Sequence, residues 1–277
     1  MELEIVPAHE VPLHEQARLA NSAFAGYVGG WADLSAETLA RFLTLQGADL
    51  FYSRFVRQAG RLAGFGYINR TGNILRLAGM GIIPDARRTG AAAHLVDALL
   101  REASERGDEA MMLEVIEQNP RAHAVYRRHG FHEVVRLLGW RRTAEAGVPQ
   151  DASTAGEEVP ILDALRMPTA QDYPELPWQI SRHAVAKAAV ARAFRTATVC
   201  VIVGDPEATP VRIYAAMSID PPRALVWRDL RSVLAGVLAR FPHRDFFAPA
   251  IFPEEFGRQL YAPLGFKPEP ISQFLMR

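Results

Sequence analysis

The sequence predicts an α/β protein with a mixed sheet that carries helices on its faces. Two observations in the first half lead to this class. Three consecutive strand-like segments are joined by short turns at Gln58-Ala59-Gly60 and Thr71-Gly72, and they are followed by a strand–helix–strand–helix–strand run. A third observation is the length, because 277 residues suffice for two domains and the second half repeats the order of elements.

The elements of the first half follow from hydrophobic periodicity and from turn and cap residues. Ser35 is expected to cap the second helix, and Asn119-Pro120 suits the start of the last one. Strands are expected over residues 3–6, 49–57, 61–69, 73–83, 110–116 and 132–141. Helices are expected over residues 12–25, 36–45 and 120–128, and along the apolar face formed by Leu95, Val96, Leu99, Leu100 and Ala103.

Residues 143–160 are rich in Ala, Gly, Pro, Ser, Thr and acids without periodicity, which is typical of a linker. We therefore expect domains at 1–142 and 161–277. The second half predicts helices at 183–194, 229–241 and 254–260, and strands at 199–203, 211–218, 246–251 and 271–276. The motif Tyr126-x-x-x-Gly130-Phe131 recurs as Tyr261-x-x-x-Gly265-Phe266, so the second half is interpreted as a worn copy of the first, with chance similarity as the alternative.

Composition narrows the class of protein. Lys plus Arg equals Asp plus Glu, so no overall field attracts nucleic acid or an acidic membrane, and neither is an expected partner. Cys200 lies alone in an apolar run and predicts a buried structural thiol in a reducing compartment. No signal peptide, membrane span or metal-ligand cluster is recognised, and a cytoplasmic protein is expected.

The turn between the strand ending at Ile83 and the next helix combines cations with small residues. It reads Arg87-Arg88-Thr89-Gly90-Ala91-Ala92 and coincides with a helix N-terminus, where unpaired N–H groups and the helix dipole favour an anion. Such a turn can hold a phosphate or pyrophosphate. By itself it is equally consistent with an ordinary turn that carries solvated arginines.

Three further residues are candidates for a functional site, although the role of each can also be explained by structure alone. Glu114 interrupts an apolar strand, which is costly unless the carboxylate is paired or faces a cleft. Asn119 is sufficiently explained as a helix cap, and Tyr126 as a core aromatic.

Taken together, Arg87-x-x-Gly90-x-Ala92, Leu113-Glu114-Val115, Asn119, Ala122 and Tyr126-x-x-x-Gly130-Phe131 resemble the GCN5-related N-acetyltransferases, or GNAT family, over about half the chain. The resemblance implies two GNAT-like domains, each a mostly antiparallel sheet with splayed central strands. It implies that the first domain binds acetyl-CoA and releases CoA. The residues it assigns to the cofactor are Met80, Gly81, Ile82, Ile83, Arg87, Arg88, Thr89, Gly90, Ala91, Ala92, Asn119, Ala122 and Tyr126.

The same resemblance implies a catalytic pair. Tyr126 matches the family's general acid, which protonates the departing thiolate, and Glu114 matches the base used by members that acetylate protein N-termini. The oxyanion would be held by a backbone N–H between Met80 and Ile82. The expected activity is acetyl transfer to an amine, and the alternative is a non-catalytic acyl-CoA-binding or regulatory protein.

The acceptor and the second half are less defined. Tyr27, Trp31 and Trp140 are candidate substrate residues, and the acceptor is a small-molecule amine or a protein N-terminus. At the junction that corresponds to the Arg/Gly turn, the second half has Pro221-Pro222 and no glycine. We therefore expect one acetyl-CoA per chain, Tyr261 as a core residue, and a second half that completes the cleft, covers a sheet edge or mediates homodimer contacts.

Overall fold

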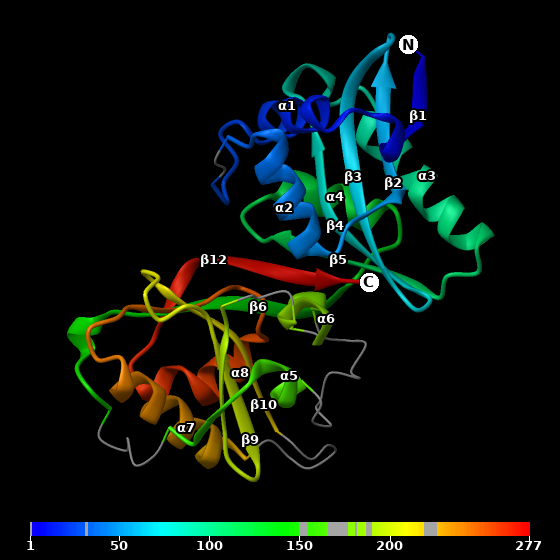
Figure 1. Ribbon diagram of the computed structural model, residues 1–277. Coiled ribbons are helices and arrows are strands. Elements are labelled where there is room, and N and C mark those ends of the chain that lie inside the picture. The colour runs from blue at the N-terminus through cyan, green and yellow to red at the C-terminus, as the bar shows by residue number, and fades with distance from the viewer. Residues whose placement is uncertain are drawn as a thin grey trace. The chain divides into compact units, whose positions relative to one another are not determined.

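The computed structural model (Figure 1) describes residues 2–30, 33–149, 155–165, 177–180, 182–186, 190–218 and 226–277. The chain divides into two units. Unit 1 comprises Met1–Val134 together with Phe274–Arg277, and unit 2 comprises Val135–Gln273.

Unit 1 is built on a sheet with the strand order β1-β2-β3-β4-β5. Neighbouring strands are antiparallel except for β4 and β5, which are parallel. The strands are β1 (Leu3–Pro7), β2 (Asp49–Gln58), β3 (Arg61–Thr71), β4 (Ile74–Ile82) and β5 (Ala110–Ile116). The helices are α1 (Leu13–Phe24), α2 (Ala36–Gln46), α3 (Ala91–Glu105) and α4 (Pro120–Arg128), with 3-10 turns η1 (Ala8–Glu10) and η2 (Pro84–Ala86).

Helices cover both faces of this sheet, as the two-residue alternation of apolar side chains requires. On β2, Phe55 packs in the cluster that contains α1 and α2, whereas the next residue, Val56, packs in the cluster that contains α3 and Tyr126 of α4. Figure 1 shows α1 and α2 together on one side of the strands and α3 on the other. The mixed sheet flanked by helices confirms the predicted fold class.

The parallel pairing of β4 with β5 is short. It begins at Ile74↔Ala110 and ends at Leu77↔Leu113, although β4 continues to Ile82 and β5 to Ile116. Beyond Leu77, β4 remains paired with β3 on its other side. The two central strands therefore diverge, and the backbone of β4 after Leu77 loses its neighbour on that side.

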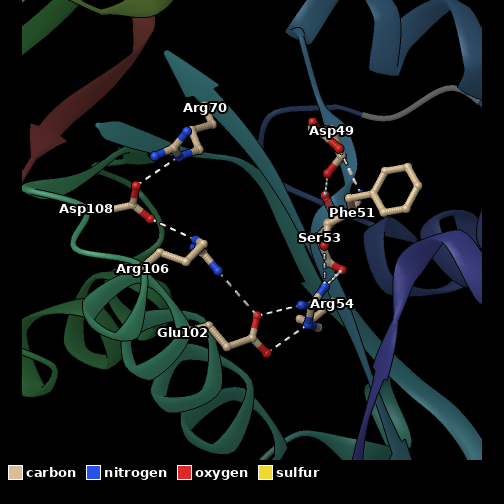
Figure 2. Close-up of polar contacts among 8 residues, drawn as sticks. All are labelled: Asp49, Phe51, Ser53, Arg54, Arg70, Glu102, Arg106 and Asp108. Carbon is tan, nitrogen blue, oxygen red and sulfur yellow. Dashed lines mark hydrogen bonds and ion pairs between the residues drawn. The ribbon is translucent and has the colours of Figure 1, made fainter. Parts of the chain in front are cut away.

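A ladder of alternating charges joins the C-terminal end of α3 to β2 and β3, as Figure 2 shows. Arg54 of β2 binds Glu102 of α3 at 2.6 Å, and Arg106 lies 3.6 Å from the same carboxylate. Arg106 and Arg70 of β3 then share Asp108, at 3.0 and 2.8 Å. These contacts join the C-terminal end of α3 to the sheet.

The last residues of the sequence complete unit 1. His132 and Arg277 exchange two backbone hydrogen bonds, of 2.9 and 3.0 Å. Phe274 packs on His123 of α4 with 5.8 Å between ring centroids, and Met276 is fully buried in the cluster that contains Tyr126. The helix that carries Tyr126 is therefore supported by residues far away in the sequence.

Unit 2 has the strand order β12-β6-β11-β10-β9-β8-β7. Its strands are β6 (Glu133–Arg142), β7 (Glu157–Val159), β8 (Arg192–Arg195), β9 (Val199–Val203), β10 (Val211–Ser218), β11 (Phe246–Ala248) and β12 (Lys267–Met276), the ends of β6 and β12 belonging to unit 1. The helices are α5 (Ile161–Leu165), α6 (Arg182–Val185), α7 (Trp227–Arg240) and α8 (Glu254–Leu260), with 3-10 turns η3 (Ala144–Ala146), η5 (Trp178–Ile180) and η6 (Ala262–Leu264).

Alternation on β9 again separates two faces. Val199, Val201 and Val203 pack with α7 and α8, whereas Cys200 and Ile202 pack in a smaller cluster with α5 and α6. Burial raises the pKa of the Cys200 thiol to about 12, and the thiol is structural, as predicted.

Two expectations about local structure were wrong. Residues 192–195, predicted as the end of a helix, form strand β8, because Ala193 and Phe194 point to opposite faces and the segment pairs with β9. Residues 157–159, assigned to the linker, form β7. The compact units divide between Val134 and Val135, and β6 pairs with β11 of unit 2. The domains at 1–142 and 161–277 stay a prediction.

Candidate functional site

The turn between η2 and α3 has an unusual backbone. Arg88 and Gly90 both adopt positive φ, at 66° and 94°, and positive φ in a non-glycine residue is a strained conformation. Residues 87–90 are exposed, and no side chain caps the N-terminus of α3, which begins at Ala91. The N–H groups of the first turn of a 15-residue helix are thus left to an external acceptor.

This turn fits a pyrophosphate. A Cβ placed on Gly90 would meet no atom within 4 Å, so the space in front of the turn is open to a ligand. Anions bind at helix N-termini because the peptide dipoles and free N–H groups converge there. The predicted residues Arg88, Thr89, Ala91 and Ala92 lie around this position in the described backbone.

Arg87 makes two hydrogen bonds within unit 1. Its Nη2 donates to the carbonyl of Ala23 at 2.9 Å and its Nε to that of Ile82 at 3.2 Å. The guanidinium therefore ties the turn to the C-terminal end of α1 and to β4. Since these donors already have partners, we assign Arg87 to holding the turn in place.

The end of β4 lies just before this turn in the sequence and carries further predicted cofactor residues. Gly81 and Ile82 belong to β4, and Ile83 follows directly. A Cβ on Gly81 would lie 2.8 Å from the Phe65 ring and 2.9 Å from Cβ of Ala23, so only glycine fits between β4 and α1. The predicted oxyanion donors of this strand lie on its divergent part.

Asn119 and Tyr126 are positioned by α4. The Asn119 side chain accepts from the Ala122 N–H at 3.3 Å and caps the helix, with Pro120 in the first turn, as predicted. Two turns further on, the Tyr126 hydroxyl donates to Sδ of Met80 on β4, at 3.6 Å. The structure thus places the predicted acid against the divergent part of β4, beside a sulfur atom.

Tyr126 is only 8% exposed, and its hydroxyl is shielded from water. Burial raises the pKa of Tyr126 well above the usual tyrosine value, and the nearby Tyr27 adds to this rise. The phenol is therefore protonated throughout the physiological range. This is the state that a proton donor needs before the leaving group forms.

Tyr27 lies on the loop after α1 and closes the same region. Its hydroxyl hydrogen-bonds to the Asn119 side chain, and burial is the main cause of its raised pKa. Gly29, on the same loop, is tightly packed: a Cβ there would lie 2.7 Å from the Ile116 side chain and 2.9 Å from the Tyr27 ring. The loop therefore packs on the end of β5.

Glu114 is already engaged. Arg76 of β4 binds its carboxylate with Nη2 at 2.6 Å and with Nε at 2.8 and 3.1 Å from the two oxygens. Nη1 of Arg76 donates to Oε1 of Gln46 at 3.0 Å. Arg76 and Gln46 were missed by sequence reasoning. The available signal was a single charge in each of two apolar strands, Arg76 in β4 and Glu114 in β5.

The remaining predicted residues lie elsewhere. Trp140 is 4% exposed in the core of unit 2, where it pairs with Ala248 and packs against Gly257. Trp31 and the junction at Pro221-Pro222 fall outside the described residues.

Two general features concern the described part of the chain. None of its helices is both long enough and apolar enough to span a membrane. Within the same residues, no group of three or more His, Cys, Asp or Glu side chains could hold a metal ion.

Comparisons with known proteins agree with this fold. Residues 17–131 match the model of the acetyltransferase (GNAT) family. A comparison with curated proteins finds no match. Among solved structures, a GCN5-related N-acetyltransferase from Anabaena variabilis is 14% identical, with a TM-score of 0.64 over 100% of this chain and 72% of the other. One from Sphaerobacter thermophilus is 15% identical, with a TM-score of 0.61 over 99% and 94%.

A further match covers both halves. The tandem GNAT protein from the clavulanic acid biosynthesis pathway is 18% identical, with a TM-score of 0.57 over 99% of this chain and 98% of the other. At such identities the likeness establishes the fold. The family model matches residues 17–131, and the likeness to the tandem GNAT protein extends over both halves of the chain. The whole chain thus has the fold of the GCN5-related and tandem GNAT structures, and its first half contains the segment that matches the GNAT family model.

Proposed function

We propose that the protein is an N-acetyltransferase that binds acetyl-CoA in unit 1 and transfers the acetyl group to an amine. The observation that carries the proposal is the Tyr126 hydroxyl, buried, protonated and directed at Met80 where β4 and β5 diverge. Bound acetyl-CoA would supply an acetyl group as its thioester. Transfer to the amine would form an amide bond, break the C–S bond and release the CoA thiol.

The residues of this chain have separate tasks. The exposed turn at Arg88–Gly90 and the first N–H groups of α3 would hold the pyrophosphate. The β4 backbone from Met80 to Ile82, together with Ile83, would line the pantetheine and offer an N–H to the oxyanion. Tyr126 would give its proton to the departing sulfur. We do not assign the base to Glu114, because both of its oxygens accept from Arg76.

The acceptor side is formed by the loop at Tyr27, which contacts Asn119 and the end of β5. A phenol ring beside a buried polar group suits an amine attached to a small molecule or to a protein N-terminus. We infer further that the chain acts in the cytoplasm. Unit 2 is proposed to hold no cofactor, so that one acetyl-CoA binds per chain.

A panel of amines tests the proposal, with release of the CoA thiol as the signal. We expect turnover with at least one class among polyamines, amino acids, aminoglycosides and peptide N-termini. Calorimetric titration should give a stoichiometry near one acetyl-CoA per chain. Binding without turnover on any amine would favour the acyl-CoA-binding or regulatory alternative, and two cofactors per chain would contradict the assignment to unit 1 alone.

A further inference from the structure

A buried ion pair stands where β4 and β5 separate. Arg76 lies one residue before the last paired position of β4, Leu77, and Glu114 lies one residue after its partner, Leu113. The side chains of Arg76 and Glu114 are only 8% and 4% exposed. Gln46, the last residue of α2, binds the same guanidinium. Two strands and a helix of unit 1 therefore meet at this one contact.

The contact occupies the Glu114 carboxylate. Arg76 donates to both carboxylate oxygens, so each oxygen already has a charged hydrogen-bond donor. An acceptor ammonium would have to reach an oxygen that is almost completely buried. The arrangement therefore opposes the role that the position of Glu114 suggested.

The contact does have a mechanical role. Moving two charges out of water is costly, and a bidentate pair offsets that cost only while its geometry is kept. This geometry sets the positions of β4 and β5 at the point of divergence. Further along, Met80 of β4 meets Tyr126, which is carried by the helix that follows β5. The spacing between Met80 and Tyr126 thus depends on how the strands diverge.

We propose that Arg76 and Glu114 are positioning residues that set the divergence of β4 and β5, and that Glu114 is not the base of the reaction. The inference rests on the proposed function for its kinetic part. The inference also predicts changes in stability and in cofactor binding, and both are measured without turnover.

A double-mutant cycle tests the proposal. Arg76→Met and Glu114→Met each leave one charge buried without its partner, whereas the double variant places two apolar side chains of similar size together. We expect each single variant to lose stability to urea and to lower kcat/KM at least tenfold at a temperature where it is folded. The double variant should recover stability and most of the lost kcat/KM.

The outcome for a catalytic Glu114 is different. Loss of a general base lowers the rate by about 10²–10⁴-fold, and replacing Arg76 as well would not restore it. A folded double variant with stability regained but kcat/KM still reduced a hundredfold, and with its acid limb gone from the pH profile, would overturn the proposal. An acid limb at the same pH in the double variant and the parent protein supports it.

The pair Arg54 and Glu102 of Figure 2 gives a matched control. It is also bidentate and partly buried in unit 1, but it joins β2 to α3. Arg54→Met and Glu102→Met should lower stability with kcat and the Kd for CoA unchanged, whereas Arg76→Met should alter both. If the parent protein neither binds CoA nor acetylates any amine, the proposed function fails. If it does both and the rescue is absent, this inference fails.

Discussion

The turn that follows the tyrosine of the Tyr-x-x-x-Gly-Phe motif has the same hydrogen bond in both units but different surroundings. After Tyr126, Phe131 N–H bonds to the Tyr126 carbonyl at 3.2 Å, and Gly130 has a φ of 91°. After Tyr261, Phe266 N–H bonds to the Tyr261 carbonyl at 3.2 Å, and Gly265 has a φ of 81°. The tyrosine and phenylalanine rings lie 5.9 and 5.3 Å apart in units 1 and 2.

The chemistry of the two tyrosines differs. The Tyr126 hydroxyl reaches Met80, whereas Tyr261 is fully buried and its hydroxyl has no partner in the described part of the chain. Trp140 packs 6.4 Å from the Tyr261 ring, measured between centroids. The motif Tyr-x-x-x-Gly-Phe therefore specifies a turn and a ring contact. Whether the phenol is functional depends on what the neighbouring strands place beside it.

The ends of the parallel strands differ in the same way. In unit 2, β10 pairs with β11 only at Val211↔Phe246 and Arg212↔Phe247, so a divergence is retained. Arg212 lies at this end, as Arg76 does in unit 1, but Pro249 follows β11 where Glu114 continues β5. Burial lowers the pKa of Arg212, and its Nε lacks a partner among the described residues. Unit 2 thus lacks the carboxylate of the unit 1 pair at this place.

The largest effect is expected at the phosphate turn. Gly90→Glu adds bulk and negative charge where a pyrophosphate is proposed to bind, so the affinity for acetyl-CoA should fall at least about a hundredfold. Gly72→Glu is the matched control, because Gly72 also has positive φ and open space around it but lies in the turn between β3 and β4. Calorimetry that finds equal affinity in both folded variants would contradict the assignment.

The two tyrosines should respond differently to loss of the hydroxyl. Tyr126→Phe should lower kcat about 10²-fold and leave the Kd for acetyl-CoA nearly unchanged, since only a proton donor is removed. Tyr261→Phe should leave kcat unchanged, because the Tyr261 hydroxyl is enclosed in the core of unit 2. Steady-state kinetics decide the matter, and a kcat within about twofold of the parent for Tyr126→Phe would make Tyr126 a core aromatic.

The smallest effect concerns stability. The buried Tyr261 hydroxyl has no described partner, so Tyr261→Phe should be neutral or slightly stabilising at pH 8. Burial raises the pKa of Tyr261 in the folded state, and the unfolded chain therefore loses its proton first, above about pH 10. Stability should fall as the pH rises beyond that value, and less steeply in Tyr261→Phe.

Urea unfolding of both proteins at pH 8 and pH 10.5 measures this difference. Equal losses of stability in the two proteins would show that the Tyr261 hydroxyl ionises as readily in the folded protein as in the unfolded chain.

Local features of the fold could be read from the sequence because they depend on neighbouring residues. Asn119 and Pro120 start a helix by capping and by a fixed φ, and Ser35 caps α2 through the Thr38 N–H. The apolar alternation of β2 and β3 and the helical spacing in α3 likewise depend only on local order. The position of Tyr126 at the end of α4 could be predicted because its motif contains the whole turn that follows the helix.

Features that depend on strand pairing could not be read in this way. Arg76 and Glu114 are 38 residues apart and meet only because of the parallel register between β4 and β5. An alternating strand such as β6 has the same pattern in either unit, so its pairing with β11 was not visible in the sequence. The hydrogen bond from Arg87 to the Ala23 carbonyl was likewise not visible in the sequence, because a backbone carbonyl carries no side-chain signal.

The return of residues 274–277 to unit 1 has a consequence for the order in which the protein is made. A ribosome releases the first half of the chain long before these residues, and most N-terminal domains fold at that stage. Here Arg277 and Phe274, the partners of His132 and His123, are synthesised only after residues 135–273. Nascent unit 1 therefore lacks these contacts until translation has passed through the second half.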